Sequence, residues 1–200
     1  MVKTKASSGV AQGGCTFQFS GISPLSFGKA FMTPRESNED YDVYENRVWR
    51  ERCHVTSEGE VFVPPMMMKL AITMAASRVA DSVPGKGSAK FGKFIAGGTL
   101  IVDPIILVPK VRIGDVQPER LYVNADGKRG GGTRVWRIFP HIAEWGGTCT
   151  MHIVDGLLLA HLDKVENYVR YAGMMIGLGR FAPRVGGYYG RFKVTAFEEC

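Results

Sequence analysis

The segment 176–194 combines glycine with basic and aromatic residues near the C-terminal end of the sequence. It reads IGLGRFAPRVGGYYGRFKV and contains five glycines, four arginines or lysines and no acidic residue. Glycine allows backbone N–H groups to come close to an oxyanion. Each phosphate that a cation neutralises adds salt-sensitive affinity, and aromatic rings offer faces on which bases stack. The segment therefore predicts contacts with a sugar–phosphate chain from Gly177, Gly179, Arg180, Phe181, Arg184, Gly186, Gly187, Tyr188, Tyr189 and Arg191.

Two other segments repeat this combination. The segment 83–98 reads VPGKGSAKFGKFIAGG, and the segment 128–137 reads KRGGGTRVWR. For any single segment the alternative is that its glycines make tight turns and its aromatic residues belong to the core. Three such segments together favour a polyanionic partner. They add to the predicted nucleic-acid-binding residues Lys86, Lys90, Lys93, Lys128, Arg129, Arg134 and Arg137.

Two phosphate-binding motifs are nearly present, and both fail on their context. The segment 87–93 (GSAKFGK) fits G-x-x-x-x-G-K, but Phe94 stands where a P-loop needs Ser or Thr to hold magnesium. This segment also follows a predicted helix, and no helix is expected to begin after it. The segment 177–182 (GLGRFA) fits G-x-G-x-x-A without a preceding βαβ unit. We therefore predict neither an NTPase nor a dinucleotide-binding protein.

Acid–base chemistry has few candidates in this sequence. They stand without an obvious partner nearby, and they are His54, His141, His152, His161 and Asp103. Because RNA cleavage needs a general acid or base at the scissile phosphate, an endoribonuclease remains an alternative. Zinc is not expected, since Cys149 and His152 would point to opposite faces of a strand. We predict no catalytic residue, no metal and no cofactor.

Charge is distributed unevenly along a chain whose net charge is +6. Residues 36–60 contain eight acidic and three basic residues, whereas the rest contains eleven acidic and twenty-two basic residues. The acidic segment could meet a basic surface on a neighbouring copy, which predicts a homo-oligomer. Scattered cysteines indicate a reducing compartment, and no apolar run approaches the length of a membrane span or a signal peptide. We expect a cytoplasmic protein with no membrane partner.

The hydrophobic pattern predicts one domain over residues 1–200 with two helices and four core strands. The strands fall within 15–22, 99–109, 133–142 and 146–156 with a corner at Glu144-Trp145 between these two, and 188–197; the helices cover 64–82 and roughly 158–173. This order is the β-α-β-β-α-β arrangement of a ferredoxin-like, RRM-like α+β fold, with an antiparallel sheet and two helices on one face. In the first helix, Met67, Leu70, Ala71 and Met74 are expected to face the core. An acidic hairpin insertion (36–63, with a strand over 41–55) and a loop or hairpin insertion (110–133) complete the prediction.

The predicted helix followed by GLGRFAPRVGGYYGRFKV resembles the C-terminal glycine-rich loop of the RAMP superfamily of CRISPR-associated RNA-binding proteins. The residues that carry this resemblance are Gly177, Gly179, Gly186, Gly187 and Gly190. The resemblance implies a backbone-type subunit of a ribonucleoprotein that binds single-stranded RNA and often carries a hairpin thumb. A phage-encoded relative would place the protein in a bacterial host cell.

The leading hypothesis is a non-catalytic protein that binds single-stranded RNA, or DNA, and assembles along the strand. The endoribonuclease of the same fold is the second hypothesis. A viral structural or assembly protein, whose basic loops contact an acidic protein, is the third.

Overall fold

The core of the structure is a four-stranded antiparallel sheet. The computed structural model describes residues 13–125 and 132–200. The sheet has the order β3-β7-β1-β8, and its strands are β1 (Gly13–Gly21), β3 (Thr99–Leu100), β7 (Gly146–Ile153) and β8 (Phe192–Glu199). All three strand pairs are antiparallel. With helices between β1 and β3 and again between β7 and β8, this is the ferredoxin-like arrangement, and the predicted fold class is confirmed.

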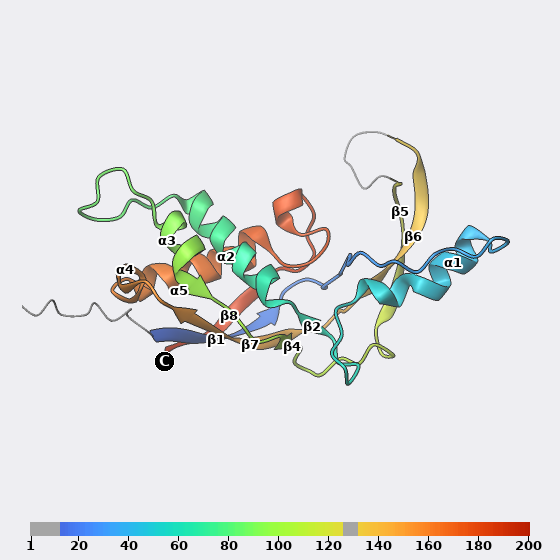
Figure 1. Ribbon diagram of the computed structural model, residues 1–200, viewed down its shortest axis with the longest axis horizontal. Coiled ribbons are helices and arrows are strands. Elements are labelled where there is room, and N and C mark those ends of the chain that lie inside the picture. The colour runs from blue at the N-terminus through green and yellow to red at the C-terminus, as the bar shows by residue number, and fades with distance from the viewer. Residues whose placement is uncertain (1–12, 126–131) are drawn as a thin grey trace, which may run out of the picture.

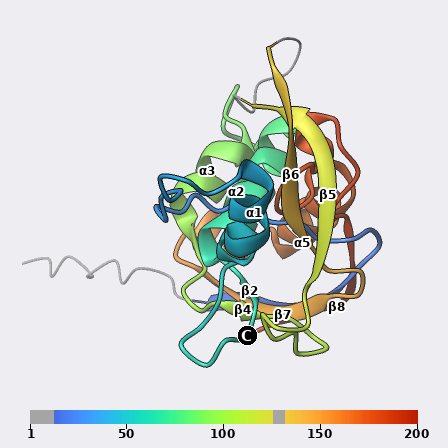
Figure 2. The same cartoon turned by 90° about the vertical axis from the view of Figure 1, so that its right-hand side faces the viewer.

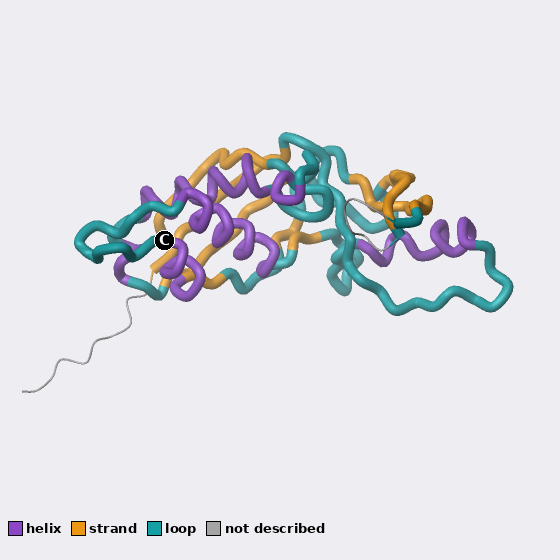
Figure 3. Tube along the Cα trace, turned by 90° about the horizontal axis from the view of Figure 1, so that it is seen from above, coloured by secondary structure: helices purple, strands orange, loops and turns teal. Residues whose placement is uncertain are grey.

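Helices cover one face of the sheet (Figure 1), as a view from above also shows (Figure 3). Alternate strand residues such as Phe17, Phe19, Met151 and Phe192 are buried beneath them. This alternation follows from the two-residue period of a strand, which sends successive side chains to opposite faces. The covering helices are α2 (Pro65–Val79), α3 (Phe91–Gly98), α4 (Gly156–Leu159) and α5 (Leu162–Tyr171).

Helix α2 begins at the predicted place, but only part of the predicted stripe is confirmed: Ala71 is buried, and Met67 is partly buried against the core. Pro65 occupies its first turn, where the missing N–H costs nothing. Leu70 and Met74, which were expected in the core, are exposed. The sequence MMMKLAITMAA is apolar on two adjacent faces, so the spacing of three and four fits either face. The buried face combines two large residues with three alanines, which let α2 approach its neighbours closely; the buried residues are Met68, Ala71, Ile72, Ala75 and Ala76.

The second predicted helix is confirmed with an interruption. Helix α4 ends at Leu159 and α5 begins at Leu162, after which a π-helix (η2, Ala172–Ile176) leads into the glycine-rich loop. Val165 and Val169 are fully buried, as the predicted stripe requires. Helix α3 was not predicted, because its sequence FGKFIAGG ends in two glycines, which are poor helix formers.

The acidic segment forms a helix where a strand was predicted. Helix α1 (Tyr41–Val48) begins after Asp40, whose carboxylate accepts a hydrogen bond from the N–H of Asp42. A 3-10 helix, η1 (Trp49–Arg52), continues it. The alternating pattern of YDVYENRVWR misled the prediction, because the N-cap and tertiary contacts of α1 outweigh local β propensity. The expected turn at Gly59 is present, since Val55 pairs with Val61 across it.

Two two-stranded sheets lie outside the main sheet. Strand β2 (Phe62–Val63) pairs with β4 (Ile105–Ile106), and β5 (Gln117–Asn124) pairs with β6 (Arg134–His141). The predicted core strand 99–109 is divided between two sheets, because β3 ends at Leu100 and β4 begins at Ile105; the gap includes the predicted break at Asp103-Pro104. The long β5–β6 ribbon stands beside α1 at one end of the molecule (Figure 2). The predicted insertion 110–133 contains only its first strand, so that the hairpin extends to His141.

His54 gives the fold a pH dependence. Its ring is half-buried against Phe27 and Phe62, at centroid distances of 5.4 Å and 5.9 Å. Burial, and to a smaller extent the charge of Lys29, lowers the pKa of His54 below its usual 6.5. The folded protein therefore favours the neutral ring, and this stability is lost as the pH falls below 6.5 through the lowered pKa.

We expect the free energy of unfolding to fall between neutral and mildly acidic pH, and the variant His54→Phe to reduce this fall. Urea unfolding at several pH values measures it. The control is His152→Gln, because His152 is exposed on the sheet. Equal pH dependence in the wild type and in His54→Phe would contradict the assignment.

Candidate functional site

The glycine-rich loop is held by backbone hydrogen bonds, both within the loop and to residues 24–26. The N–H of Leu178 donates to the carbonyl of Gly190 (2.9 Å), and the N–H of Arg180 donates to the carbonyl of Ser26 (2.7 Å). The N–H of Gly190 donates in turn to the carbonyl of Pro24 (2.7 Å). A β-carbon at Gly187 or Gly190 would collide with a backbone carbonyl of the same loop. These glycines thus allow close approach of backbone to backbone, and their hydrogen-bonded N–H groups are not free for phosphate.

The basic and aromatic residues of this loop divide between structure and surface. Arg184 donates to the carbonyls of Gly177 (2.8 Å) and Gly179 (2.6 Å), so its guanidinium closes the loop. Arg191 donates to the carbonyl of Met174 (3.1 Å). In contrast, Tyr188 is 55% exposed.

The loop packs against the base of the β5–β6 ribbon. Tyr189 is buried, and its hydroxyl donates to the carboxylate of Glu119 at 2.7 Å. Burial and this hydrogen bond raise the pKa of Tyr189. Phe181 makes an edge contact with Phe139 of β6, at a centroid distance of 5.5 Å. Residues 177–191 and 134–137, which belong to two separate segments predicted to bind nucleic acid, therefore lie on neighbouring elements.

Three arginines from three elements meet at this junction. Arg52 comes from η1, Arg137 from β6 and Arg180 from the glycine-rich loop, and together they line a cavity of about 210 Å³. Phe139, Gly28 and the end of β5 at residues 124–125 complete its lining. We call this cavity the arginine pocket.

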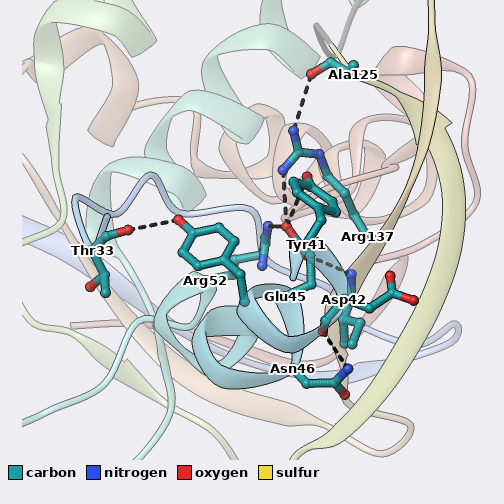
Figure 4. Close-up of polar contacts among 10 residues, drawn as sticks. Thr33, Tyr41, Asp42, Glu45, Asn46, Arg52, Ala125 and Arg137 are labelled. Atoms are coloured by element: carbon teal, nitrogen blue, oxygen red, sulfur yellow. Dashed lines mark hydrogen bonds and ion pairs between the residues drawn. The ribbon is translucent and has the colours of Figure 1, made fainter. Parts of the chain in front are cut away.

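One buried carboxylate serves two of these arginines. Glu45 of α1 is 1% exposed, and its Oε1 lies 3.1 Å from Nη2 of Arg52 and 3.2 Å from Nη1 of Arg137. Its Oε2 accepts the backbone N–H of Ile138 at 3.0 Å. Figure 4 shows Glu45 between the two guanidinium groups. Arg180 has no such partner within the described residues.

Arg180 is held by rings instead of acids. Its guanidinium carbon lies 4.2 Å from the centroid of Phe139 and 4.6 Å from that of Phe181. Burial, together with the charges of Arg52 and Arg137, lowers the pKa of Arg180. The guanidinium stays charged, because arginine does not lose its proton in proteins. Among the residues that the structure describes, the arginine pocket therefore has more positive than negative charge.

The ribbon carries a second feature, an exposed aromatic pair. Tyr122 and Trp136 face each other across β5 and β6 with ring centroids 5.1 Å apart. They are 52% and 48% exposed, and Arg120 lies 5.2 Å from the Trp136 ring. Strand alternation places this pair on the opposite face of the ribbon from Phe139, which lines the arginine pocket.

The lysine-rich loop lies apart from this region. The loop before α3 and the β5–β6 ribbon are at opposite ends of the molecule (Figures 1 and 3). Lys90 donates to the hydroxyl of Ser82 (2.7 Å), and Lys86 lies over the ring of Phe94. Lys93 is exposed on α3. Lys128 and Arg129 fall outside the described residues.

Sequence reasoning missed four residues of this region: Arg52, Phe139, Tyr122 and Glu45. Arg52 and Glu45 belong to the segment assigned to an acidic hairpin. A helical reading would have revealed them, since Glu45 and Arg52 are seven residues apart, which is two turns of a helix. Tyr122 could have been found from the alternation of QPERLYVN, which predicts a strand facing TRVWRIFP.

The free face of the main sheet is not an aromatic platform. Its exposed residues include Gln18, Thr148, Thr150, His152, Lys193, Thr195 and Glu198, with Leu100 at one edge. The exposed aromatic side chains of the described chain are Tyr122, Trp136 and Tyr188, and all lie on the ribbon or the glycine-rich loop. Stacking of bases on this sheet, as RRM domains do it, is therefore not supported.

The histidines do not form a catalytic group. His54 packs on Phe27, His141 on Tyr189 and His161 on Phe91. His152 stands exposed on the free face of the sheet. Within residues 13–125 and 132–200, no three metal-ligating side chains gather at one place.

The acidic segment finds partners within the chain. Glu39 pairs with Arg47, Asp42 with Arg120, Glu45 with Arg52 and Arg137, and Glu60 with Lys110. Half of the eight acidic residues of 36–60 are thus already paired. Self-assembly through this segment remains a prediction, with less free negative charge than the sequence indicated.

The chain is similar in fold to CRISPR-associated proteins. No protein-family model and no curated protein matches it. The crystal structure of Cmr6 from Pyrococcus furiosus matches with a TM-score of 0.45 and 13% identity, covering 93% of this chain and 100% of that one. A chain of the Type III-B Cmr-beta complex bound to cognate target RNA matches with a TM-score of 0.48 and 11% identity, covering 94% and 60%.

A chain of a CRISPR RNA-guided surveillance complex matches with a TM-score of 0.42 and 8% identity, covering 94% of this chain and 68% of that one. The Cmr structures are of the RAMP type, the family that the C-terminal loop resembles. At these identities and TM-scores the likeness does not establish what this chain binds or does. In the part of the chain that the structure describes, no helix has the length and apolar character needed to cross a membrane.

Proposed function

We propose that this protein binds single-stranded nucleic acid, RNA in preference to DNA, without cleaving it. The observation that carries the proposal is the gathering of exposed aromatic rings and arginines on two adjoining elements. Tyr122, Trp136 and Tyr188 offer faces for bases. The exposed arginines of the ribbon, Arg120 and Arg134, offer charge to phosphates. The resemblance of the C-terminal loop to RAMP proteins favours RNA.

The ribbon face with Tyr122 and Trp136 is the main stacking surface in this proposal. A base can stack on the exposed indole, while Arg120 and Arg134 lie on the same face by strand alternation. Each such stacking contact contributes about 1–3 kcal/mol. Because salt screens the phosphate contacts but not the stacking, affinity should fall with salt without vanishing.

The test is fluorescence anisotropy with a short labelled single-stranded RNA and the matching DNA, at several salt concentrations. We expect Trp136→Ala with Tyr122→Ala to weaken binding by about tenfold to a hundredfold. The matched control is Lys86→Ala with Lys93→Ala, which removes two exposed cations at the other end of the molecule. We expect these to change the affinity by less than about threefold.

Absence of binding by the wild type at low salt would overturn the proposal. If the ribbon variant and the lysine variant lose equal affinity, the binding surface is not confined to the ribbon and includes the lysine-rich loop. Intact substrate after prolonged incubation is expected, whereas shortened products lost in a histidine variant would favour the endoribonuclease. The mass of the complex on RNA of increasing length tests assembly along the strand.

A further inference from the structure

The arginine pocket contains more positive charge and more hydrogen-bond donors than the described part of the chain pairs. We propose that it is a binding site for one phosphomonoester group. The source of this group follows from the proposed function: if the protein binds single-stranded nucleic acid, the ligand is the terminal phosphate of the strand. A free mononucleotide carries the same group and is the other source.

The first argument is charge. Three guanidinium groups line the pocket, and Glu45 is the single carboxylate that pairs with them within the described residues. Counted over residues 13–125 and 132–200, two positive charges of the pocket remain without a counterion. A phosphomonoester carries between one and a half and two negative charges at neutral pH, roughly matching this excess. An internal phosphodiester carries only one, so the pocket suits a strand end better than a point along the strand.

The second argument is the donors. Nη1 of Arg52 and Nε of Arg180 are buried without a hydrogen-bond partner among the described residues. The side chain of Arg52 is only 6% exposed, and both residues line the pocket. Leaving a charged donor buried and unsatisfied is costly, so such groups in a native fold call for a partner. Phosphate oxygens are acceptors that suit the planar guanidinium.

The third argument is preorganisation. The rings of Phe139 and Phe181 hold the guanidinium of Arg180 without occupying its N–H groups. Arg52 is fixed by Glu45 and lies 5.2 Å from the centroid of Phe139. Gly28 forms part of the lining, and a β-carbon there would lie 3.2 Å from the Arg180 side chain. The donors are thus positioned before a ligand arrives, which lowers the entropic cost of binding.

The test compares one RNA sequence with a 5′-phosphate, with a 3′-phosphate and with hydroxyl groups at both ends. We expect one phosphorylated form to bind about tenfold more tightly than the hydroxyl form. The variant Arg180→Gln should lose this difference, while its affinity for the hydroxyl form changes much less. Lys193→Gln is the control, because it removes an exposed charge from the C-terminal segment on the free face of the sheet.

A second measurement does not depend on strand binding. Adenosine monophosphate should raise the Tm of the wild type, adenosine should not, and Arg180→Gln should abolish the increase. Without ligand, the Tm of Arg180→Gln should equal or exceed that of the wild type, because the substitution relieves repulsion among the three arginines.

The outcomes separate the two proposals. If the hydroxyl form binds, the phosphorylated forms bind no better and the monophosphate leaves the Tm unchanged, the phosphomonoester site is wrong and the proposed function stands. If no strand binds but the monophosphate raises the Tm through Arg180, the site stands with a free mononucleotide as its ligand, and the proposed function fails.

Discussion

Replacing Glu45 by Gln is expected to lower the free energy of unfolding by about 3–5 kcal/mol, the cost of breaking a buried ion pair by removing one partner. Glutamine keeps the size of the side chain and one acceptor oxygen. It removes the charge that compensates Arg52, whose side chain is 6% exposed. It also weakens the link to β6 through Arg137 and the N–H of Ile138. Glu45 is thus the buried carboxylate that joins α1 to both η1 and the ribbon.

Urea unfolding followed by circular dichroism measures this loss as a lower midpoint at an unchanged slope. The matched control is Asp42→Asn, which breaks another carboxylate–arginine pair between α1 and the ribbon. In this pair the side chains of Arg120 and Asp42 are 49% and 56% exposed, so we expect the free energy of unfolding to fall by less than about 1 kcal/mol. Losses of equal size in the two variants would show that burial does not set the strength of the Glu45 contact.

Gly190→Ala is expected to be the most damaging single-methyl change in the glycine-rich loop. Gly190 has φ = +68°, and a β-carbon there would collide with the carbonyl oxygen of Leu178. Because the N–H of Leu178 donates to the carbonyl of Gly190, the added methyl group forces apart two backbone segments that are bonded to each other. We expect a loss of about 3 kcal/mol or more in unfolding free energy, with faster proteolysis of the loop.

Gly85→Ala isolates the contribution of backbone conformation. Gly85 has φ = +71°, nearly that of Gly190, but a β-carbon there meets nothing within 4 Å. Its expected cost is the left-handed conformation alone, about 1–2 kcal/mol. A Gly190→Ala variant as stable as Gly85→Ala would mean that the loop can move aside.

The main secondary structure could be predicted because local patterns specify it. Strands such as GGTCTMHI alternate strictly, and one helix opens at a proline. Where a pattern was compatible with two structures, prediction failed. YDVYENRV has the alternation of a strand, yet Asp40 caps it and Glu45 is buried by arginines from other elements. No local rule contains those partners.

The same division holds for the candidate site. Glycine and arginine in 176–194 were visible from the sequence, but their tasks were not. Arg184 donates to carbonyls of the loop, and Tyr189 is buried and donates to Glu119. Arg180 remains without an acidic partner within the described residues. Which arginine is used internally depends on atoms from distant segments, and three-dimensional contact alone brings those atoms together.

By itself, the sequence determined the order of core strands and helices, the basic character of the chain and the glycine requirement near its end, since these follow from residue type and short-range period. Only the tertiary structure decided that Arg52, Arg137 and Arg180 share one pocket. These residues are separated by 85 and 43 positions in sequence. Charges so far apart in the chain acquire a common electrostatic environment only when packing excludes the solvent that would otherwise screen them.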